Sequence, residues 1–264
     1  MFAESAFDHV LDTPHWHIFE KVGFHLPLGL TKYMILMLVA ALLIMAIYIP
    51  LAKKVQSGAP PRGRWWNAFE SLLEFIRDQV AKPYMGHDAD RYVPFLWTLF
   101  LFILFCNLLG MFPFMGSPTA SFSVTLALAI ITFCFIHGSA IAKLGVVHYF
   151  KSYIPHVEVP FGMGYVIIPM IVAIEIMGNF IKAFVLAVRL FANMFAGHMV
   201  LAFILLFIIM VRDADPGLFW GVTGASVLGV TALSLLELFV AFLQAYIFTF
   251  LTALFLGSAL HPEH

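Results

Sequence analysis

Residues 162–211 decide the fold class, because the run GMGYVIIPMIVAIEIMGNFIKAFVLAVRLFANMFAGHMVLAFILLFIIMV stays apolar for 50 residues. A hydrocarbon core of about 30 Å needs only about 20 residues of helix. A second run, residues 217–260, continues for 44 residues. As unbroken helices the two runs would measure about 75 and 66 Å, so neither fits upright in one bilayer.

Two arrangements accommodate such lengths. Either each run contains a break, or both helices lie steeply tilted across the membrane. The candidate break points are Pro169, Gly178, Gly197 and Gly229. We expect the tilt, because no charged loop interrupts either run, and residues 162–260 are therefore predicted to form a long tilted helical hairpin.

The remaining chain is also apolar, with 62% hydrophobic and 11% charged residues in a total of 264. Soluble domains carry about 25% charged residues, so a soluble globular enzyme is excluded. Three further runs are long enough to span a membrane, residues 33–51, 93–112 and 120–142. The last two are joined by PFMGSPT, and we expect a helical hairpin there. The sequence thus predicts an all-α integral membrane protein with five transmembrane helices in a single membrane domain, residues 1–264.

One further segment, WWNAFESLLEFIRDQV at residues 65–80, differs in kind because apolar and charged residues occupy opposite faces of a helix. The apolar set is Trp66, Phe69, Leu72, Leu73, Ile76 and Val80, and the charged set is Glu70, Glu74, Arg77 and Asp78. We predict an amphipathic surface helix over residues 62–84, lying on the membrane and offering a docking ledge to a partner.

Basic residues gather in two of the loops. They are Lys53, Lys54, Arg62, Arg64, Arg77, Lys82 and Arg91 in the first loop, and Lys143 and Lys151 in the third. Such loops face the cytoplasm. The N-terminal segment, residues 1–29, is acidic and has no basic start, so we expect it on the outer side, uncleaved, with the C-terminus in the cytoplasm.

Charge and cysteine content exclude other classes. A formal net charge of −1 provides no basic field for nucleic acid. Cys106 and Cys134 fit neither a disulfide framework nor zinc-ligand spacing, and we expect no metal and no cofactor.

Ionisable residues at membrane depth are expensive and mark functional sites. Glu175, Lys182 and Arg189 recur every seven residues and share one helical stripe. His198 follows Arg189 by nine residues, which places it on the opposite side of an unbroken helix. Arg189 is close to the midpoint of its run, with Glu175 toward the cytoplasmic end and His198 toward the outer end. This order predicts two half-channels separated by a central cation.

Structural roles remain open for several of these residues. Lys182 can snorkel while Glu175 pairs with it at i+7. His137, alone on its span, fits a structural hydrogen bond better than a proton-carrying role. Gln244 follows Glu237 by seven residues and shares its face, but spacing alone does not decide whether it reaches Arg189.

Four segments together carry a resemblance to a known family. They are VLAVRLFANMFAGH at residues 185–198, NLLGMFP at 107–113, PTASFSVTLALA at 118–129, and residues 237–246, whose final Gln-Ala-Tyr is followed by Ile-Phe. The chain resembles subunit a of the rotary F-type ATP synthase over nearly its whole length. The resemblance implies a non-catalytic membrane stator that grips a ring of small c subunits, each with one buried carboxylate, beside b-type subunits of the peripheral stalk.

The resemblance also implies roles for single residues. Arg189 would face the ring, with Gln244 as its polar neighbour and Asn193 as a lining residue. Glu175 would line the cytoplasmic half-channel. His198 and Glu237 stand where many bacterial relatives have Glu and His, an exchanged arrangement also met in mitochondrial-type members.

Two departures from the family pattern affect the outer half-channel. Gly110 and Ser121 stand where a number of bacterial relatives carry Asp. The outer pathway is therefore expected to depend on His198 and Glu237, with Asn107, Ser121 and Ser123 as further lining residues.

The expected function is a proton-conducting stator in a bacterial inner membrane, in preference to a mitochondrial one, with the choice between protons and sodium ions left open. An autonomous proton- or ion-coupled transporter is the main alternative, although the chain shows no internal repeat of the kind common in carriers. A haem-binding cytochrome fits less well, because His137 and His198 are lone histidines on their spans.

Overall fold

A computed structural model of the chain describes residues 31–56, 63–112, 116–151, 164–212 and 215–261. The described residues contain helices and no strand. The longer helices are α3 (Lys32–Gln56), α6 (Ala89–Gly110), α7 (Phe122–Leu144), α9 (Gly164–Met210) and α10 (Pro216–Leu260). Five helical stretches of the described residues are long and apolar enough to cross a membrane, which confirms the predicted fold class. The predicted outer-side segment, residues 1–29, lies outside the described residues.

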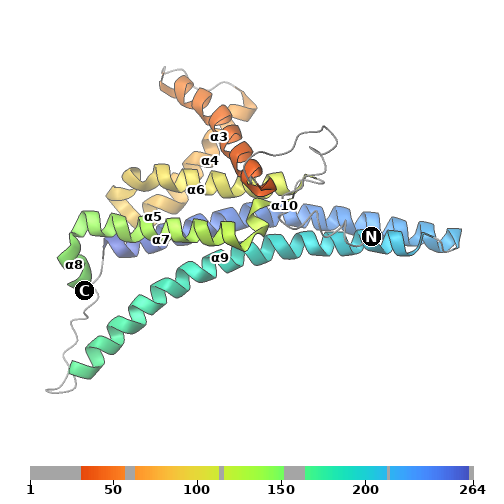
Figure 1. The fold of residues 1–264 in the computed structure, drawn as a ribbon. Helices are drawn as coiled ribbons and strands as arrows, with labels where there is room; N and C mark the ends of the chain where they lie inside the picture. Colours follow the sequence, from red (N-terminus) through yellow and green to blue (C-terminus); the bar gives the residue numbers. More distant parts are fainter. Residues whose placement is uncertain (1–30, 57–62, 113–115, 152–163, 213–214, 262–264) are drawn as a thin grey trace.

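The two overlong helices, α9 and α10, are each continuous, over 47 and 45 residues. None of the four candidate break points interrupts them, and α9 instead curves along its length (Figure 1). Each helix is about 70 Å long, more than twice the thickness of a hydrocarbon core of about 30 Å. A steep tilt is therefore the arrangement that keeps both helices inside one bilayer.

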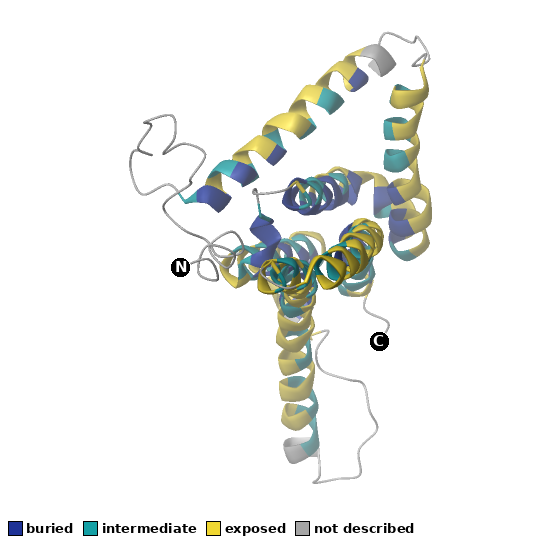
Figure 2. Cartoon of the chain, turned by 90° about the vertical axis from the view of Figure 1, so that its right-hand side faces the viewer, coloured by how far each residue is buried: buried dark blue, intermediate teal, exposed yellow. Residues whose placement is uncertain are grey.

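Helix α10 lies at the centre of the packing. Helices α6, α7 and α9 all pack against it. Small or short side chains on α10 are fully buried and let its neighbours approach, and they are Ala241, Ala245, Thr249 and Ala253. Gly257 shows the closest approach, since a Cβ there would lie 2.3 Å from the backbone oxygen of Tyr84. Figure 2 shows buried residues concentrated where the helices converge and exposed ones along the projecting arms.

The predicted hairpin of residues 93–142 needs a correction. A 3-10 turn (Pro118–Ala120) precedes α7, but α6 packs mainly against α10, and α7 packs against α9 and α10, with little packing between α6 and α7. They meet through Phe135, whose ring stacks on Phe95 at 3.6 Å between centroids and makes an edge contact with Tyr92. The long α10 packs against both α6 and α7. Because α10 is distant from them in the sequence, adjacent segments gave no sign of this packing.

The predicted surface helix consists of three successive pieces: α4 (Arg64–Phe75), a π-helical stretch (Ile76–Ala81) and α5 (Lys82–Met85). Helix α4 has no buried residue, whereas Ile76 and Val80 in the π stretch are fully buried. The indole of Trp97 donates a hydrogen bond of 2.8 Å to the Leu73 oxygen and ties α6 to α4. The second half of this segment therefore packs against protein.

The short helix α8 (Val146–Lys151) follows α7 after a turn at Gly145. Gly145 has a φ of +80°, a left-handed conformation that side-chain-bearing residues rarely adopt. The turn redirects the chain so that α8 folds against the end of α7 (Figure 1).

Candidate functional site

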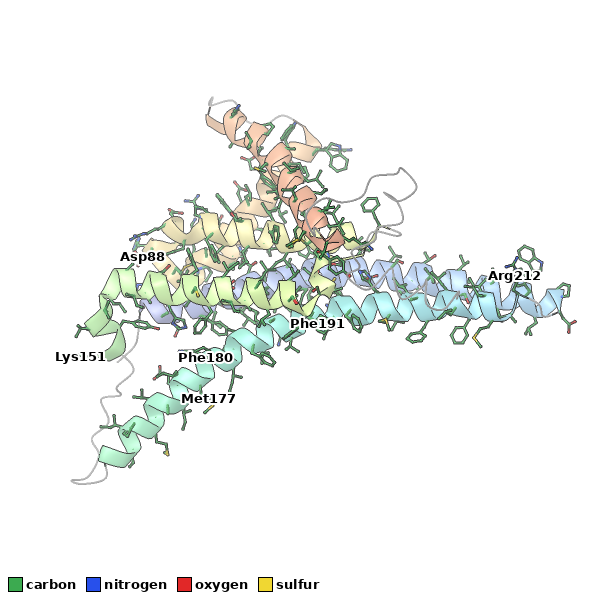
Figure 3. All side chains as sticks on the ribbon, in the orientation of Figure 1. Asp88, Lys151, Met177, Phe180, Phe191 and Arg212 are labelled. Atoms are coloured by element: carbon green, nitrogen blue, oxygen red, sulfur yellow. The ribbon has the colours of Figure 1, made fainter. Side chains whose placement is uncertain are left out.

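The charged stripe of α9 faces outward. Glu175, Lys182 and Arg189 are all exposed, and Arg189 is close to the middle of the helix. Large apolar side chains surround them on the same helix, such as Met177 and Phe184, which are 57% and 54% exposed (Figure 3). Within the described residues, no acidic side chain pairs with Arg189. Arg189 is thus an exposed cation among large apolar side chains of α9.

The suggested pairing of Glu175 with Lys182 is absent from the structure. The Lys182 ammonium donates a hydrogen bond of 3.3 Å to Asn179 Oδ1 and lies 5.2 Å from the centre of the Phe255 ring. A cation over an aromatic face is stabilised by the ring quadrupole, which gives Lys182 a partner on α10 in place of Glu175. The structure therefore does not support the alternative in which the two residues form a structural pair, and Glu175 keeps its carboxylate available for other groups.

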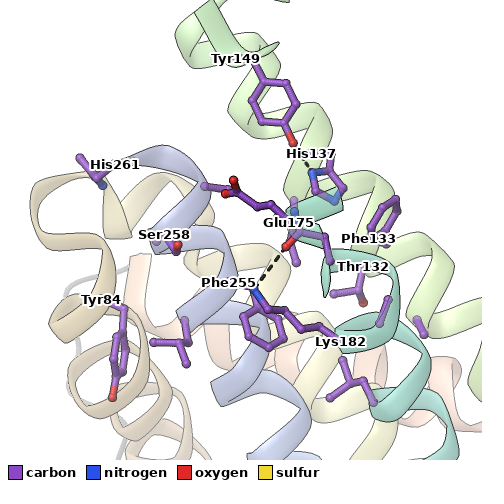
Figure 4. Close-up of a pocket in the computed structure, with 18 residues that line it drawn as sticks. Tyr84, Thr132, Phe133, His137, Tyr149, Glu175, Lys182, Phe255, Ser258 and His261 are labelled. Carbon is purple, nitrogen blue, oxygen red and sulfur yellow. Dashed lines mark hydrogen bonds between the residues drawn. The ribbon is translucent and has the colours of Figure 1, made fainter. Parts of the chain in front are cut away.

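Glu175 and Lys182 both line a cavity of about 520 Å³ at one end of the helix bundle. We name it the His137 cavity, because His137 of α7 lines it as well, together with Tyr149 of α8 and His261 beyond α10 (Figure 4). The cavity brings together two residues predicted to have separate roles, Glu175 and His137.

A cluster of charged residues lies at the same end of the bundle. Lys143 at the end of α7 contacts Asp88 before α6 at 2.5 Å. His261 lies 3.1 Å from the Lys143 ammonium and 3.4 Å from the Asp88 carboxylate. The start of α6 and the ends of α7 and α10 are therefore held together. They lie at the end of the bundle where the sequence predicts a cytoplasmic basic loop.

On the other side of Arg189 along α9, His198 meets Glu237 of α10. Their Nδ1 and Oε1 atoms are 2.8 Å apart, and the two side chains are 10% and 8% exposed. The contact lacks hydrogen-bond alignment, so Glu237 Oε1 remains among the buried atoms without a hydrogen bond. Gly197 makes room for this carboxylate, since a Cβ there would lie 2.9 Å from Glu237 Oε1. The structure thus brings together two residues singled out from the sequence.

The antiparallel register of the two long helices also places Gln244. His198 faces Glu237, and four residues earlier Met194 shares a buried cluster with Ala241. The same register continued toward Arg189 reaches the level of Gln244. No contact joins the Gln244 amide to Arg189, and its nitrogen is one of the buried atoms without a hydrogen-bond partner in the described protein. Asn193, half-buried, lies one turn beyond Arg189.

Asn107 belongs to a buried hydrogen-bond network. Its amide nitrogen donates to the Ala241 oxygen at 3.1 Å, and its amide oxygen accepts from the Thr119 hydroxyl at 2.6 Å. Ser117 continues the network, because its hydroxyl lies 2.6 Å from that of Thr119. The network connects α6 and the 3-10 turn to α10 one helical turn from Glu237. Sequence reasoning missed Thr119 and Ser117, since their segment indicated only a turn.

The other predicted lining residues lie differently. Ser121 is half-buried directly before α7, and Ser123 is exposed on the first turn of that helix. No contact in the described structure joins either residue to His198 or Glu237. Gly110 has no space for a side chain, because a Cβ there would lie 2.3 Å from that of Ser117. Close packing therefore explains why glycine stands at this position.

His137 forms a side-chain hydrogen bond, as expected from the sequence. Its Nδ1 lies 2.5 Å from the Tyr149 hydroxyl. Sequence reasoning missed Tyr149, because no spacing rule predicts that α8 turns back onto α7 after Gly145.

The fold and these groups define a polytopic membrane protein with ionisable residues at membrane depth, which is the character of ion-translocating proteins. A sequence profile of the family described as ATP synthase A chain matches residues 34–257. The chain is similar to ATP synthase subunit a of Myxococcus xanthus (strain DK1622), with 38% identity over 97% of this chain and 87% of the relative.

Two further relatives agree. They are ATP synthase subunit a 2 of Chlorobaculum tepidum, 38% identical over 95% of this chain and 71% of the relative, and ATP synthase subunit a of Chloroherpeton thalassium, 38% identical over 98% of this chain and 78% of the relative. The chain belongs to the ATP synthase A chain family.

Proposed function

We propose that the chain is the proton-conducting stator subunit of an ATP synthase. In this role it provides two half-channels to a ring of c subunits and couples proton flow to ring rotation. The names of its relatives support membership in that complex. The observation that carries the proposal is the position of Arg189, exposed and without an acidic partner in the described residues, between the His137 cavity and the His198–Glu237 pair.

The outer half-channel would run through the contact between α9 and α10. His198 and Glu237 can each exchange a proton, and buried polar atoms without hydrogen bonds mark the same helix pair. A proton delivered there neutralises a ring carboxylate. Neutralisation matters because a charged carboxylate is penalised in lipid, so only the protonated subunit rotates out of the interface.

The inner half-channel would be the His137 cavity. After nearly a full turn the ring carboxyl reaches the Glu175 side and loses its proton to the cytoplasm. It then passes Arg189 as an anion, since a fixed cation stabilises the ionised form. The same cation repels protons and so blocks direct passage between the half-channels. The membrane potential supplies about 2.3 kcal/mol per charge per 100 mV for the rotation.

The apolar outward face of α9 and α10 fits the ring as its partner. Large apolar side chains of α10, such as Leu235 and Phe239, are exposed as well. The exposed helix α4 offers a surface to b-type subunits of the peripheral stalk. In this assembly the chain moves protons and takes no catalytic part in ATP formation. The basic loops support an orientation in a bacterial inner membrane with the His137 cavity on the cytoplasmic side and the N-terminus outside.

Arg189 gives the direct test of this function. In the assembled complex, Arg189→Ala is expected to abolish ATP-driven proton pumping and ATP synthesis. Arg189→Lys is expected to rescue little, because a point charge does not reproduce a forked, permanently charged donor. Pumping is measured in inverted membrane vesicles, and complex content is measured on the same membranes.

Arg212 supplies a matched control at the far end of the same helix, where it is exposed. Arg212→Ala is expected to pump like the unmodified protein. Near-normal pumping by assembled Arg189→Ala complexes would rule out the proposed role.

A further inference from the structure

The His137–Tyr149 contact forms one wall of the His137 cavity (Figure 4). Tyr149 is 6% exposed, whereas its neighbours on α8, Val146, Val147 and His148, are exposed. Tyr149 is thus the residue through which α8 is anchored against the bundle. Its hydroxyl is hydrogen-bonded to Nδ1 of His137, which lines the cavity. The group that anchors Tyr149 is thus an imidazole, which can bind and release a proton.

The second ring nitrogen of His137 is free to act on the cavity. Within the described residues, no protein group is bound to Nε2, and the ring is only half-buried. The edge of Phe133 packs against the imidazole at 4.1 Å between centroids and holds its orientation. An imidazole fixed through one nitrogen and open at the other is a suitable group for passing protons to and from water.

Charged and titratable groups face His137 from each helix around the cavity. They are Glu175 and Lys182 from α9, Tyr149 from α8, Tyr84 from α5 and His261 from the end of α10. Glu175 is the acidic member, and it has no ion pair with Lys182 to hold it. A proton that reaches Glu175 is therefore in the same cavity of about 520 Å³ as the imidazole. This cavity lies at the end of the bundle that carries the basic loop.

We infer that His137, positioned by Tyr149, is a proton-exchanging residue of the half-channel that contains Glu175. The inference rests on the proposed function. In the neutral imidazole, Nδ1–H donates to the Tyr149 oxygen and the Nε2 lone pair accepts a proton from the cavity side. The resulting imidazolium releases that same proton from Nε2 to water at the rim, which restores the starting tautomer. Tyr149 keeps its own proton throughout.

Passive proton flux through vesicles that contain the assembled complex tests this assignment. His137→Ala is expected to slow the flux about tenfold or more, in line with the usual contribution of a positioned acid–base group. The pH profile of the flux is also expected to change, because the variant removes a titratable group from the cavity. Added imidazole is expected to restore most of the flux, because the cavity admits it. A purely structural role predicts no such rescue.

Tyr149→Phe separates positioning from packing. It keeps the ring and removes only the hydroxyl, so the complex is expected to assemble and to show a shifted pH profile of proton flux. His148→Ala on the exposed side of α8 is the matched control, with an unchanged profile expected.

The outcomes distinguish the two levels of the account. Absence of flux in the unmodified complex would overturn the proposed function itself. Flux in the unmodified complex, with His137→Ala unchanged or slowed without imidazole rescue, would overturn this assignment alone. Where His137→Ala fails to assemble, an unaltered pH profile in Tyr149→Phe overturns it.

Discussion

At the scale of single residues, the contact of His198 with Glu237 is the most specific arrangement in the structure. Both side chains are about nine-tenths buried and 2.8 Å apart at Nδ1 and Oε1. A buried titratable group left without its partner carries an uncompensated desolvation cost. The effects of His198 and Glu237 on proton transfer are therefore expected to be coupled and not independent.

An exchange experiment tests this coupling. His198→Glu and Glu237→His are each expected to slow passive proton flux strongly, while the double exchange recovers part of it. The measurement is a double-mutant cycle on flux through the assembled membrane sector. Strictly additive losses, with the double variant slower than either single one, would show that the residues act independently.

Gly197 offers a steric test of the same contact. Gly197→Ala adds a methyl group 2.9 Å from Glu237 Oε1, a distance at which the carboxylate must shift. Proton flux per assembled complex is expected to fall severalfold. Gly178→Ala on the same helix is the control, because nothing lies within 4 Å of its Cβ position. Equal flux in both variants would show that the Glu237 position is not critical.

At the scale of elements, the polar network around Asn107 holds α6, the 3-10 turn and α10 together. The Thr119 hydroxyl and the Asn107 amide are fully buried, so their hydrogen bond of 2.6 Å has no water to replace it. The network fixes α10 at Ala241, between Glu237 and Gln244. The packing of these elements thus fixes the part of α10 that carries Glu237 and Gln244 through one amide side chain.

Removal of the hydroxyl from this network has a defined consequence. Thr119→Val is expected to destabilise the protein by about 1 kcal/mol, because a buried amide oxygen loses its donor. The readout is the thermal stability of the purified complex. Thr98→Val is the control, since the exposed Thr98 hydroxyl bonds only to the Pro94 oxygen of its own helix. Identical stabilities of the two variants would contradict the account.

At the scale of the whole molecule, the periodicity and length of the apolar runs predicted the features of the fold that depend on local sequence. The five long apolar helices and the unbroken α9 and α10 are examples. The contact between His198 and Glu237 could also be predicted from the sequence, because each residue is costly to bury without a partner.

The rest depends on contacts between distant segments. The insertion of α10 between α6 and α7, the π stretch at residues 76–81 and the return of Tyr149 onto His137 have no local signature. Spacing alone also left open whether Lys182 pairs with Glu175, because the partner it has in the structure, Phe255, belongs to another helix.

The central claim is that Arg189 separates two aqueous compartments, with Glu175 in one and His198 in the other. Thiol labelling tests it most directly. Glu175→Cys and His198→Cys are made separately in a chain whose Cys106 and Cys134 are replaced by Ala, and a membrane-impermeant maleimide is added to one side of oriented vesicles that contain the complex. Glu175→Cys is expected to react only from the cytoplasmic side, and His198→Cys only from the outer side. Reaction of both residues from the same side would contradict the account.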